Sequence, residues 1–223
     1  MGRDDDTLRI GAVLIGNHLW ISDPSGNDKV IINNTTVTAN TYIYLTSGLD
    51  KVFIAGSGTI FGNNLFINTG DGHDLVRFIP GLSQVGNNLG IYTGGDNDQV
   101  IVDGSGTTTP LTLQVSGTTD IRTGQGDDLV RFGTRSTTGL TVDLQGTVID
   151  TGDGNDRIYM RDAIMKLLIA LLGNGNDQVL NIWGTANVMV GFGSLLDGGN
   201  HVFGDTLPSP WTPPTNLTVV NFP

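Results

Sequence analysis

The sequence contains no cysteine, which excludes disulfide bonds and thiol redox chemistry. Charged residues make up only 15% of the chain, so long helices with charged faces are not expected. No apolar run is long enough to span a bilayer, since the most apolar stretch, residues 164–172, is short and contains Lys166. A secretory signal begins with basic residues that are followed by an apolar stretch, and the N-terminal residues Met-Gly-Arg-Asp-Asp-Asp do not have this pattern. We therefore expect either a signal removed earlier or a segment excised from a larger protein.

Basic residues are scarce as well, with 11 Lys and Arg against 22 Asp and Glu and a formal net charge of -11. A field of this sign repels phosphate backbones and attracts cations, which argues against a nucleic-acid partner. Glycine, in contrast, is abundant at 33 residues, and Asn, Asp and Thr are frequent. This composition is typical of a chain that turns often.

The abundant residues recur at a fixed register, which indicates a repeat architecture. Seven aspartates, separated by 21 to 30 residues, mark the copies: Asp28, Asp50, Asp74, Asp98, Asp128, Asp156 and Asp177. Two residues after each aspartate stands a β-branched residue: Val30, Val52, Val76, Val100, Val130, Ile158 and Val179. Seven residues before each aspartate lies a second apolar column: Ile21, Ile43, Ile67, Ile91, Ile121, Ile149 and Ala170. Each copy is thus predicted to be a strand, a tight corner and a second strand.

Other residues of each copy contain a third alternating piece, such as 112–115 and 140–144. The sequence therefore predicts an all-β fold, a right-handed parallel β-helix (β-solenoid) of seven to eight coils of 21 to 30 residues with three sides. Residues 162–172 suit a helix equally well by local propensity, but the register assigns them to a strand.

Five corners share a pattern of glycine and aspartate: Gly70-Asp71-Gly72-His73-Asp74, Gly94-Gly95-Asp96-Asn97-Asp98, Gly124-Gln125-Gly126-Asp127-Asp128, Gly152-Asp153-Gly154-Asn155-Asp156 and Gly173-Asn174-Gly175-Asn176-Asp177. They resemble the nonapeptide repeats of the RTX family, in which stacked turns hold calcium. The resemblance implies export, an extracellular or cell-surface location and folding triggered by calcium. It covers the corner only, because RTX arrays have two corners per coil and this chain has one in each longer coil.

Calcium prefers six to eight oxygen ligands, which carbonyls and carboxylates of two stacked corners can supply. The predicted Ca²⁺ sites are the four gaps between the five corners, with the ligands Gly70, Asp71, Gly72, Asp74, Gly94, Asp96, Asp98, Gly124, Gly126, Asp127, Asp128, Gly152, Asp153, Gly154, Asp156, Gly173, Asn174, Gly175 and Asp177. The earlier corners, 24–28 and 46–50, lack the leading glycine and are expected to bind no ion. The alternative is that Asp and Asn only cap neighbouring amides at these corners.

Catalysis is not expected, because only three histidines occur and the acids outside the corners are scattered singly. The predicted role is a structural or adhesive segment of an exported bacterial repeat protein. A β-helix that binds or cleaves surface polysaccharide is the alternative. A third reading is an ice-binding solenoid, suggested by threonines at 35–38, 107–109 and 137–138.

The two ends of the chain differ in character. Residues 1–204 are predicted to form one solenoid domain, with residues 198–201 as a degenerate eighth corner. Residues 205–223 are rich in proline and are predicted to be a cap, a linker or an assembly strand. The final strand, 216–220, would cover its own sheet edge or pair with another copy. Copies of the chain or flanking solenoid domains are therefore candidate partners.

Overall fold

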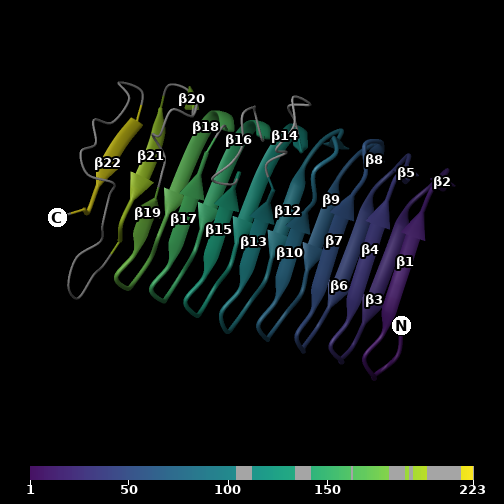
Figure 1. Ribbon diagram of the computed structural model, residues 1–223. Helices are drawn as coiled ribbons and strands as arrows, with labels where there is room; N and C mark the ends of the chain where they lie inside the picture. The colour runs from purple at the N-terminus through teal and green to yellow at the C-terminus, as the bar shows by residue number, and fades with distance from the viewer. Residues whose placement is uncertain are drawn as a thin grey trace.

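A computed structural model describes residues 1–103, 112–133, 142–161, 163–180, 189–190, 193–199 and 217–222. Within these ranges the chain is all-β, with parallel strands stacked as a β-solenoid of about seven turns (Figure 1). The predicted all-β parallel solenoid is confirmed. Among the described residues, no helix has the length and apolar character needed to cross a membrane.

The first sheet takes one strand from each coil, directly after the corner. Its strands are β1 (Thr7–Gly11), β4 (Lys29–Asn33), β7 (Lys51–Ala55), β10 (Leu75–Phe78), β13 (Gln99–Val102), β15 (Leu129–Phe132), β17 (Arg157–Met160) and β19 (Gln178–Leu180). Val30, Val52 and Val76 pair in register, and the column continues to Val179. This is the register that the aspartate spacing predicts.

The second sheet takes two consecutive segments from each early coil. The first segments are β2 (Leu14–Ile15), β5 (Thr36–Val37), β8 (Thr59–Phe61) and β11 (Ser83–Val85), and the second are β3 (Leu19–Asp23), β6 (Thr41–Leu45), β9 (Leu65–Asn68) and β12 (Leu89–Tyr92). Later coils fuse them into β14 (Leu113–Arg122), β16 (Val142–Asp150) and β18 (Ala163–Leu171). The predicted third piece therefore exists and shares a sheet with the strand that enters the corner. A register shift between Val115 and Thr118 interrupts the pairing of β14 with β16.

The stretch that suited a helix or a strand, residues 162–172, forms the strand β18 from Ala163. It pairs in parallel with β16, so that Ala170 aligns with Ile149. Tertiary pairing thus decides between two conformations of equal local propensity.

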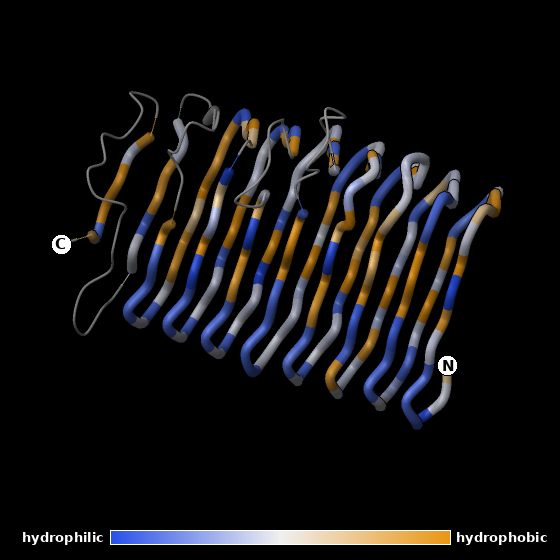
Figure 2. The backbone as a smooth tube through the Cα atoms, viewed as in Figure 1, coloured by the Kyte–Doolittle hydropathy of each residue, from blue (hydrophilic) through white to orange (hydrophobic). Residues whose placement is uncertain are grey.

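The core fills the space between the two sheets. Alternate residues of each strand point inward, and the columns that contain Val30 and Ile43 are fully buried. Phe61, Phe78 and Phe132 are the largest fully buried side chains. Polar residues gather at the corners, which form the lower edge of the view in Figure 2. The solenoid thus presents its glycine- and aspartate-rich corners along one edge.

The C-terminal coil closes with β21 (Ser194–Asp197) and β22 (Leu217–Val220), and the short β20 (Met189–Val190) also pairs with β18. β22 pairs in parallel with β21, so the last strand lies against its own sheet, one of the two expected placements. Gly199 stacks on Gly173, as an eighth corner would. The remainder of the corner, residues 200–201, and most of the proline-rich segment lie outside the described residues.

Candidate metal site at the solenoid corner

The corner turns because the residue two before each repeat aspartate adopts a positive φ. Gly72 has a φ of 132°, and Asp96, which replaces glycine in the next coil, has a φ of 73°. Aspartate is one of the few residues besides glycine that tolerates this region. Single parallel bridges, such as that between Asp71 and Gly95, keep successive corners stacked.

The repeat aspartates form a continuous ladder on the inner wall of the corner. The backbone amide of Asp98 donates to Oδ1 of Asp128 at 2.7 Å, and the amide of Asp128 donates to Oδ1 of Asp156 at 2.8 Å. The same bond joins every repeat aspartate from Asp28 to Asp177. These side chains are at most 2% exposed. In each coil, one carboxylate oxygen thus accepts a hydrogen bond from a backbone amide that has no partner in a neighbouring strand.

The second carboxylate oxygen of the ladder has no such role. Oδ2 is buried and lacks a hydrogen-bond partner in Asp28, Asp50, Asp74, Asp98, Asp128 and Asp156. Burial disfavours the charged form, so it raises the pKa of Asp50, Asp98 and Asp156 to about 7 and that of Asp74 and Asp128 to about 6. A proton or a cation would therefore stabilise this column at neutral pH.

Threonines line the opposite wall of the same corner. The Thr69 hydroxyl lowers the pKa of Asp74 and the Thr93 hydroxyl lowers that of Asp98, but in both cases desolvation has the larger effect. Four such threonines are fully buried: Thr69, Thr93, Thr123 and Thr151. Hydroxyl oxygens therefore face the carboxylates across the interior of the corner. Of the threonines that suggested ice binding, Thr35 is buried and Thr38 is exposed, and those at 107–109 and 137–138 lie outside the described residues.

A second ladder lies on the outer surface and runs in the opposite direction. Here the side chain accepts from the amide of the following coil, as Asn97 Oδ1 does from Asp127 N at 2.8 Å and Asp127 Oδ1 does from Asn155 N at 2.8 Å. His73 takes the same position, and its Nδ1 accepts from Asn97 N at 2.9 Å. The expected alternative, amide capping, therefore accounts for this outer row.

The structure divides the predicted calcium ligands between the two sides of the corner. The inward set is Asp74, Asp98, Asp128, Asp156 and Asp177, and the exposed set is Asp71, Asp96, Asp127, Asp153 and Asn174. The predicted glycines belong to the backbone of the same corners: Gly70, Gly72, Gly94, Gly124, Gly126, Gly152, Gly154, Gly173 and Gly175. Among the described residues, the three carboxylates whose ligand oxygens all lie within 4.8 Å of one another belong to neither set, and the calcium ligands expected from the motif stay a prediction.

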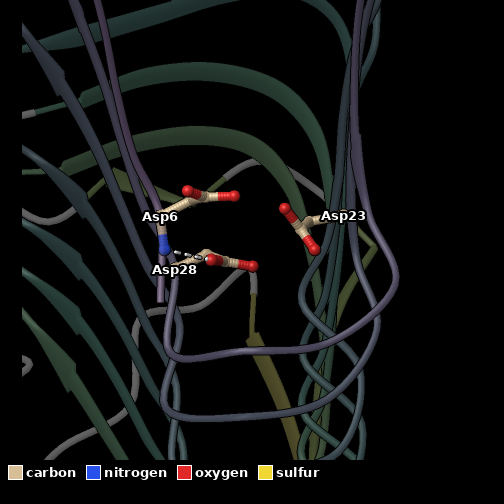
Figure 3. Close-up of side chains that lie close together, drawn as sticks. All are labelled: Asp6, Asp23 and Asp28. Atoms are coloured by element: carbon tan, nitrogen blue, oxygen red, sulfur yellow. Dashed lines mark hydrogen bonds between the residues drawn. The ribbon is translucent and has the colours of Figure 1, made fainter. Parts of the chain in front are cut away.

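The densest group of carboxylates lies instead at the first corner (Figure 3). Ligand oxygens of Asp6, Asp23 and Asp28 lie within 4.8 Å of one another, and Asp23 and Asp28 are buried. Asp28 Oδ1 accepts from the amide of Asp6, while its Oδ2 has no partner. The amino group of Met1 lies 3.8 Å from Asp23 Oδ2.

Sequence reasoning missed Asp6 and Asp23 because neither belongs to a glycine-rich corner. A signal for Asp6 was present, since Asp6 precedes Asp28 by 22 residues, which is also the spacing from Asp28 to Asp50. Asp23 occupies the row in which later coils carry threonines such as Thr69. The first corner therefore has a third carboxylate because Asp23 stands where several later coils carry threonine.

One acid outside the corners is fixed by ion pairs. Asp103 is 4% exposed, and its Oδ2 lies 2.6 Å from Arg77 Nε while its Oδ1 lies 3.2 Å from an Arg131 terminal nitrogen. The two arginines come from β10 and β15, on either side of the coil that carries Asp103. The carboxylate thus joins three successive coils.

The fold and its aspartate-lined corner define the chain as a parallel β-solenoid repeat protein. Comparisons with protein-family models, curated proteins and solved structures give no match to this chain.

Proposed function

We propose that this chain is a non-enzymatic structural segment of an exported repeat protein, stabilised by calcium inside its corners. The observation that carries the proposal is the column of buried carboxylates from Asp28 to Asp156, each with one oxygen that has no hydrogen-bond partner. Stacked carboxylates repel one another in a medium of low dielectric constant unless a cation or protons neutralise them. Calcium is a hard cation that takes oxygen ligands of this kind.

The proposed ligands differ from those expected from the motif. The first corner offers three carboxylates, from Asp6, Asp23 and Asp28, and later corners offer Oδ2 of successive repeat aspartates facing threonine hydroxyls such as that of Thr123. The exposed Asp127 already accepts from Asn155 and belongs to the capping row. The inward aspartates also accept from amides through Oδ1, but their buried Oδ2 has no hydrogen-bond partner in residues such as Asp128, and the inward row is therefore the better candidate for the metal.

An extracellular or cell-surface setting suits this proposal, because calcium sites outside cells bind in the range of about 0.1 to 1 mM. A chain that folds fully only when calcium neutralises its core would be secreted unfolded and would become rigid outside the cell. A rigid solenoid of this kind suits a structural or adhesive role.

Calcium is expected to raise the melting temperature at neutral pH, because a ligand bound only by the folded state stabilises it, by about 2.7 kcal/mol at a hundred times its Kd. Melts followed by circular dichroism would be recorded in EDTA, in millimolar calcium and in millimolar magnesium. The test variant is Asp128→Asn/Asp156→Asn, in which Asn keeps the oxygen that accepts from the backbone amide and removes the charge.

Asp127→Asn is the matched control, since it makes the same chemical change on the exposed row. We expect wild type and the control to show the calcium shift and the double variant to show a smaller one. Identical melts of the wild type in EDTA and calcium would overturn the proposal. An equal calcium shift in all three proteins would show that calcium does not bind at the inner column.

The first corner can be tested by itself. Asp23→Thr installs the residue type that later coils carry in this row, such as Thr69, and leaves two of the three carboxylates. Titration calorimetry with calcium should give about one fewer bound ion per chain for this variant. An unchanged stoichiometry and affinity would show that the cluster holds no ion.

A further inference from the structure

Aromatic side chains form a continuous row on the outer face of the second sheet. This aromatic strip consists of Trp20 on β3, Tyr42 and Tyr44 on β6, Phe66 on β9 and Tyr92 on β12. Ring centroids of Trp20 and Tyr44 lie 5.1 Å apart, those of Tyr44 and Phe66 5.3 Å, and those of Phe66 and Tyr92 5.0 Å. The strip therefore runs from coil to coil along the axis of the solenoid.

The rings face outward because the residues between them face the core. Ile43 and Ile91 are buried, and alternation along a strand places Tyr42, Tyr44 and Tyr92 on the opposite side. Trp20 is 63% exposed. Exposed apolar patches on soluble proteins are often interaction sites, and this row of contacting rings is such a patch.

The strip borders a groove of about 330 Å³ over β9 and β12. Tyr42, Phe66, Gly90 and Tyr92 contribute to its wall, and Gly90 leaves room for the Phe66 and Tyr92 rings to approach each other. The volume lies at the lower end of the range of ligand sites, about 300 to 1,000 Å³. It suits a small ring or one unit of a polymer.

Polar side chains follow the same groove. Asn64 and Asn88 belong to an asparagine ladder in which Asn64 Oδ1 accepts from Asn88 N at 3.1 Å and Asn88 Oδ1 accepts from Thr118 N at 2.9 Å. Within the described part of the chain, the exposed side-chain amide nitrogen of Asn88 donates no hydrogen bond. Donors and acceptors thus stand next to the rings.

The end of the strip carries a fixed carboxylate. Asp120 Oδ2 accepts from the Tyr92 hydroxyl at 2.7 Å, and Asp120 Oδ1 accepts from Arg122 Nε at 3.1 Å. The Arg122 guanidinium carbon also lies 5.8 Å from the centroid of the Tyr92 ring. These contacts orient the Tyr92 ring and keep a charged acceptor at the edge of the groove.

We infer that the aromatic strip binds an uncharged, linear polysaccharide that lies along the solenoid axis. Sugar rings present apolar C–H faces, which suit aromatic rings, and hydroxyls at their edges, which suit amides and carboxylates. The net charge of -11 and the carboxylate of Asp120 disfavour an acidic polymer. The linear course of the strip over four coils favours a chain over a single sugar.

The inference supplies a partner for the structural or adhesive segment proposed above, and so it rests on that proposal for its biological setting. Its surface shares no residue with the aspartate corner, so the two can fail separately. A second copy of this chain is the other occupant to consider. The net charge of -11 and the Asp120 carboxylate at the edge of the groove argue against it, since like charges on two copies repel each other.

The test is native gel electrophoresis through gels that contain a soluble polysaccharide, in the presence of calcium. The neutral probes are hydroxyethylcellulose, glucomannan and soluble starch, and the acidic probe is polygalacturonate. We expect at least one neutral probe to retard the wild type and the acidic probe not to do so. Trp20→Ala should weaken the retardation about tenfold, as loss of one exposed ring from a stacking row would.

Leu49→Ala is the control, since Leu49 is an apolar side chain, 48% exposed, at a corner and away from the strip. Tyr92→Phe removes only the hydroxyl that bonds Asp120 and should weaken retardation less than Trp20→Ala does. Failure of every neutral probe, or equal retardation of wild type and Trp20→Ala, would overturn the inference. A concentration-dependent dimer in sedimentation that Trp20→Ala abolishes would overturn it in favour of self-association. The calcium shift in melting temperature should be the same in Trp20→Ala and wild type, which separates this outcome from failure of the calcium proposal.

Discussion

Replacement of Gly152 by alanine is expected to destabilise the solenoid by more than about 4 kcal/mol. Few single substitutions in proteins cost this much free energy of unfolding. Gly152 has a φ of 86°, a left-handed conformation that costs an alanine about 1 to 2 kcal/mol. The added Cβ would also overlap the carbonyl group of Gly124 in the preceding coil. A backbone carbonyl cannot rotate away, so the two coils would have to separate at the corner.

Gly95→Ala makes the same change at a neighbouring corner and should alter stability by no more than about 0.5 kcal/mol. The Cβ at Gly95 would meet only Asp71 Oδ1, at 3.5 Å, which is an ordinary contact. Urea unfolding at a fixed calcium concentration compares the two variants through their midpoints. Equal midpoints would show that the corners are not stacked as closely as the structure has them.

The second large effect is a loss of stability with rising pH when calcium is absent. Burial raises the folded pKa of five repeat aspartates from the ordinary value of 3.8 to about 6 or 7: Asp50, Asp74, Asp98, Asp128 and Asp156. Between these values the folded state holds protons that the unfolded state has released. The free energy of unfolding should therefore be largest below about pH 4 and should fall as pH rises toward about 7, by up to about 1.4 kcal/mol per pH unit for each such carboxyl.

Calcium should reverse this trend, because it binds the ionised carboxylates and competes with protons. In unfolding titrations at about pH 4.5, 6 and 7.5, the stabilisation by calcium should grow as the protein in EDTA weakens. Asp156→Asn should reduce the slope measured in EDTA, since it keeps the acceptor Oδ1 and removes one titrating group. His73→Asn is the control for histidine titration and should leave the slope in place. A stability in EDTA that rises from about pH 4.5 to 7.5 would contradict the assignment of the inner column.

Most of the fold could be predicted from the sequence because the repeat carries its register with it. The valine and isoleucine columns, represented by Val76 and Ile67, are buried at the places that their distances from Asp74 predict. The register also assigns the stretch 162–172, which suits a helix or a strand by local propensity, to a strand, and the structure has β18 there from Ala163 to Leu171. In a periodic sequence several copies indicate the same structure, so the other copies determine the prediction when one copy is ambiguous.

The candidate site was less predictable. Asp71 and Asp74 both lie in one short corner, yet the first is exposed and the second is buried. Along a strand, alternate residues point to opposite faces, so burial can be predicted from sequence position. The positive φ of Gly72 between Asp71 and Asp74 interrupts this alternation. Convergence of Asp6, Asp23 and Asp28 depends on two coils and two sheets, and no local motif contains it.

The sequence alone determined the parallel solenoid, its register and the position of its corners, because burial of a period-two strand pattern in successive coils leaves few other solutions. Only the tertiary structure decided that the repeat aspartates point inward and hold one another's amides, and that the rings of Trp20, Phe66 and Tyr92 meet in a row. The physical reason is that both features arise between coils, from the conformation of the corner and the stacking of strands that lie more than 20 residues apart in the chain.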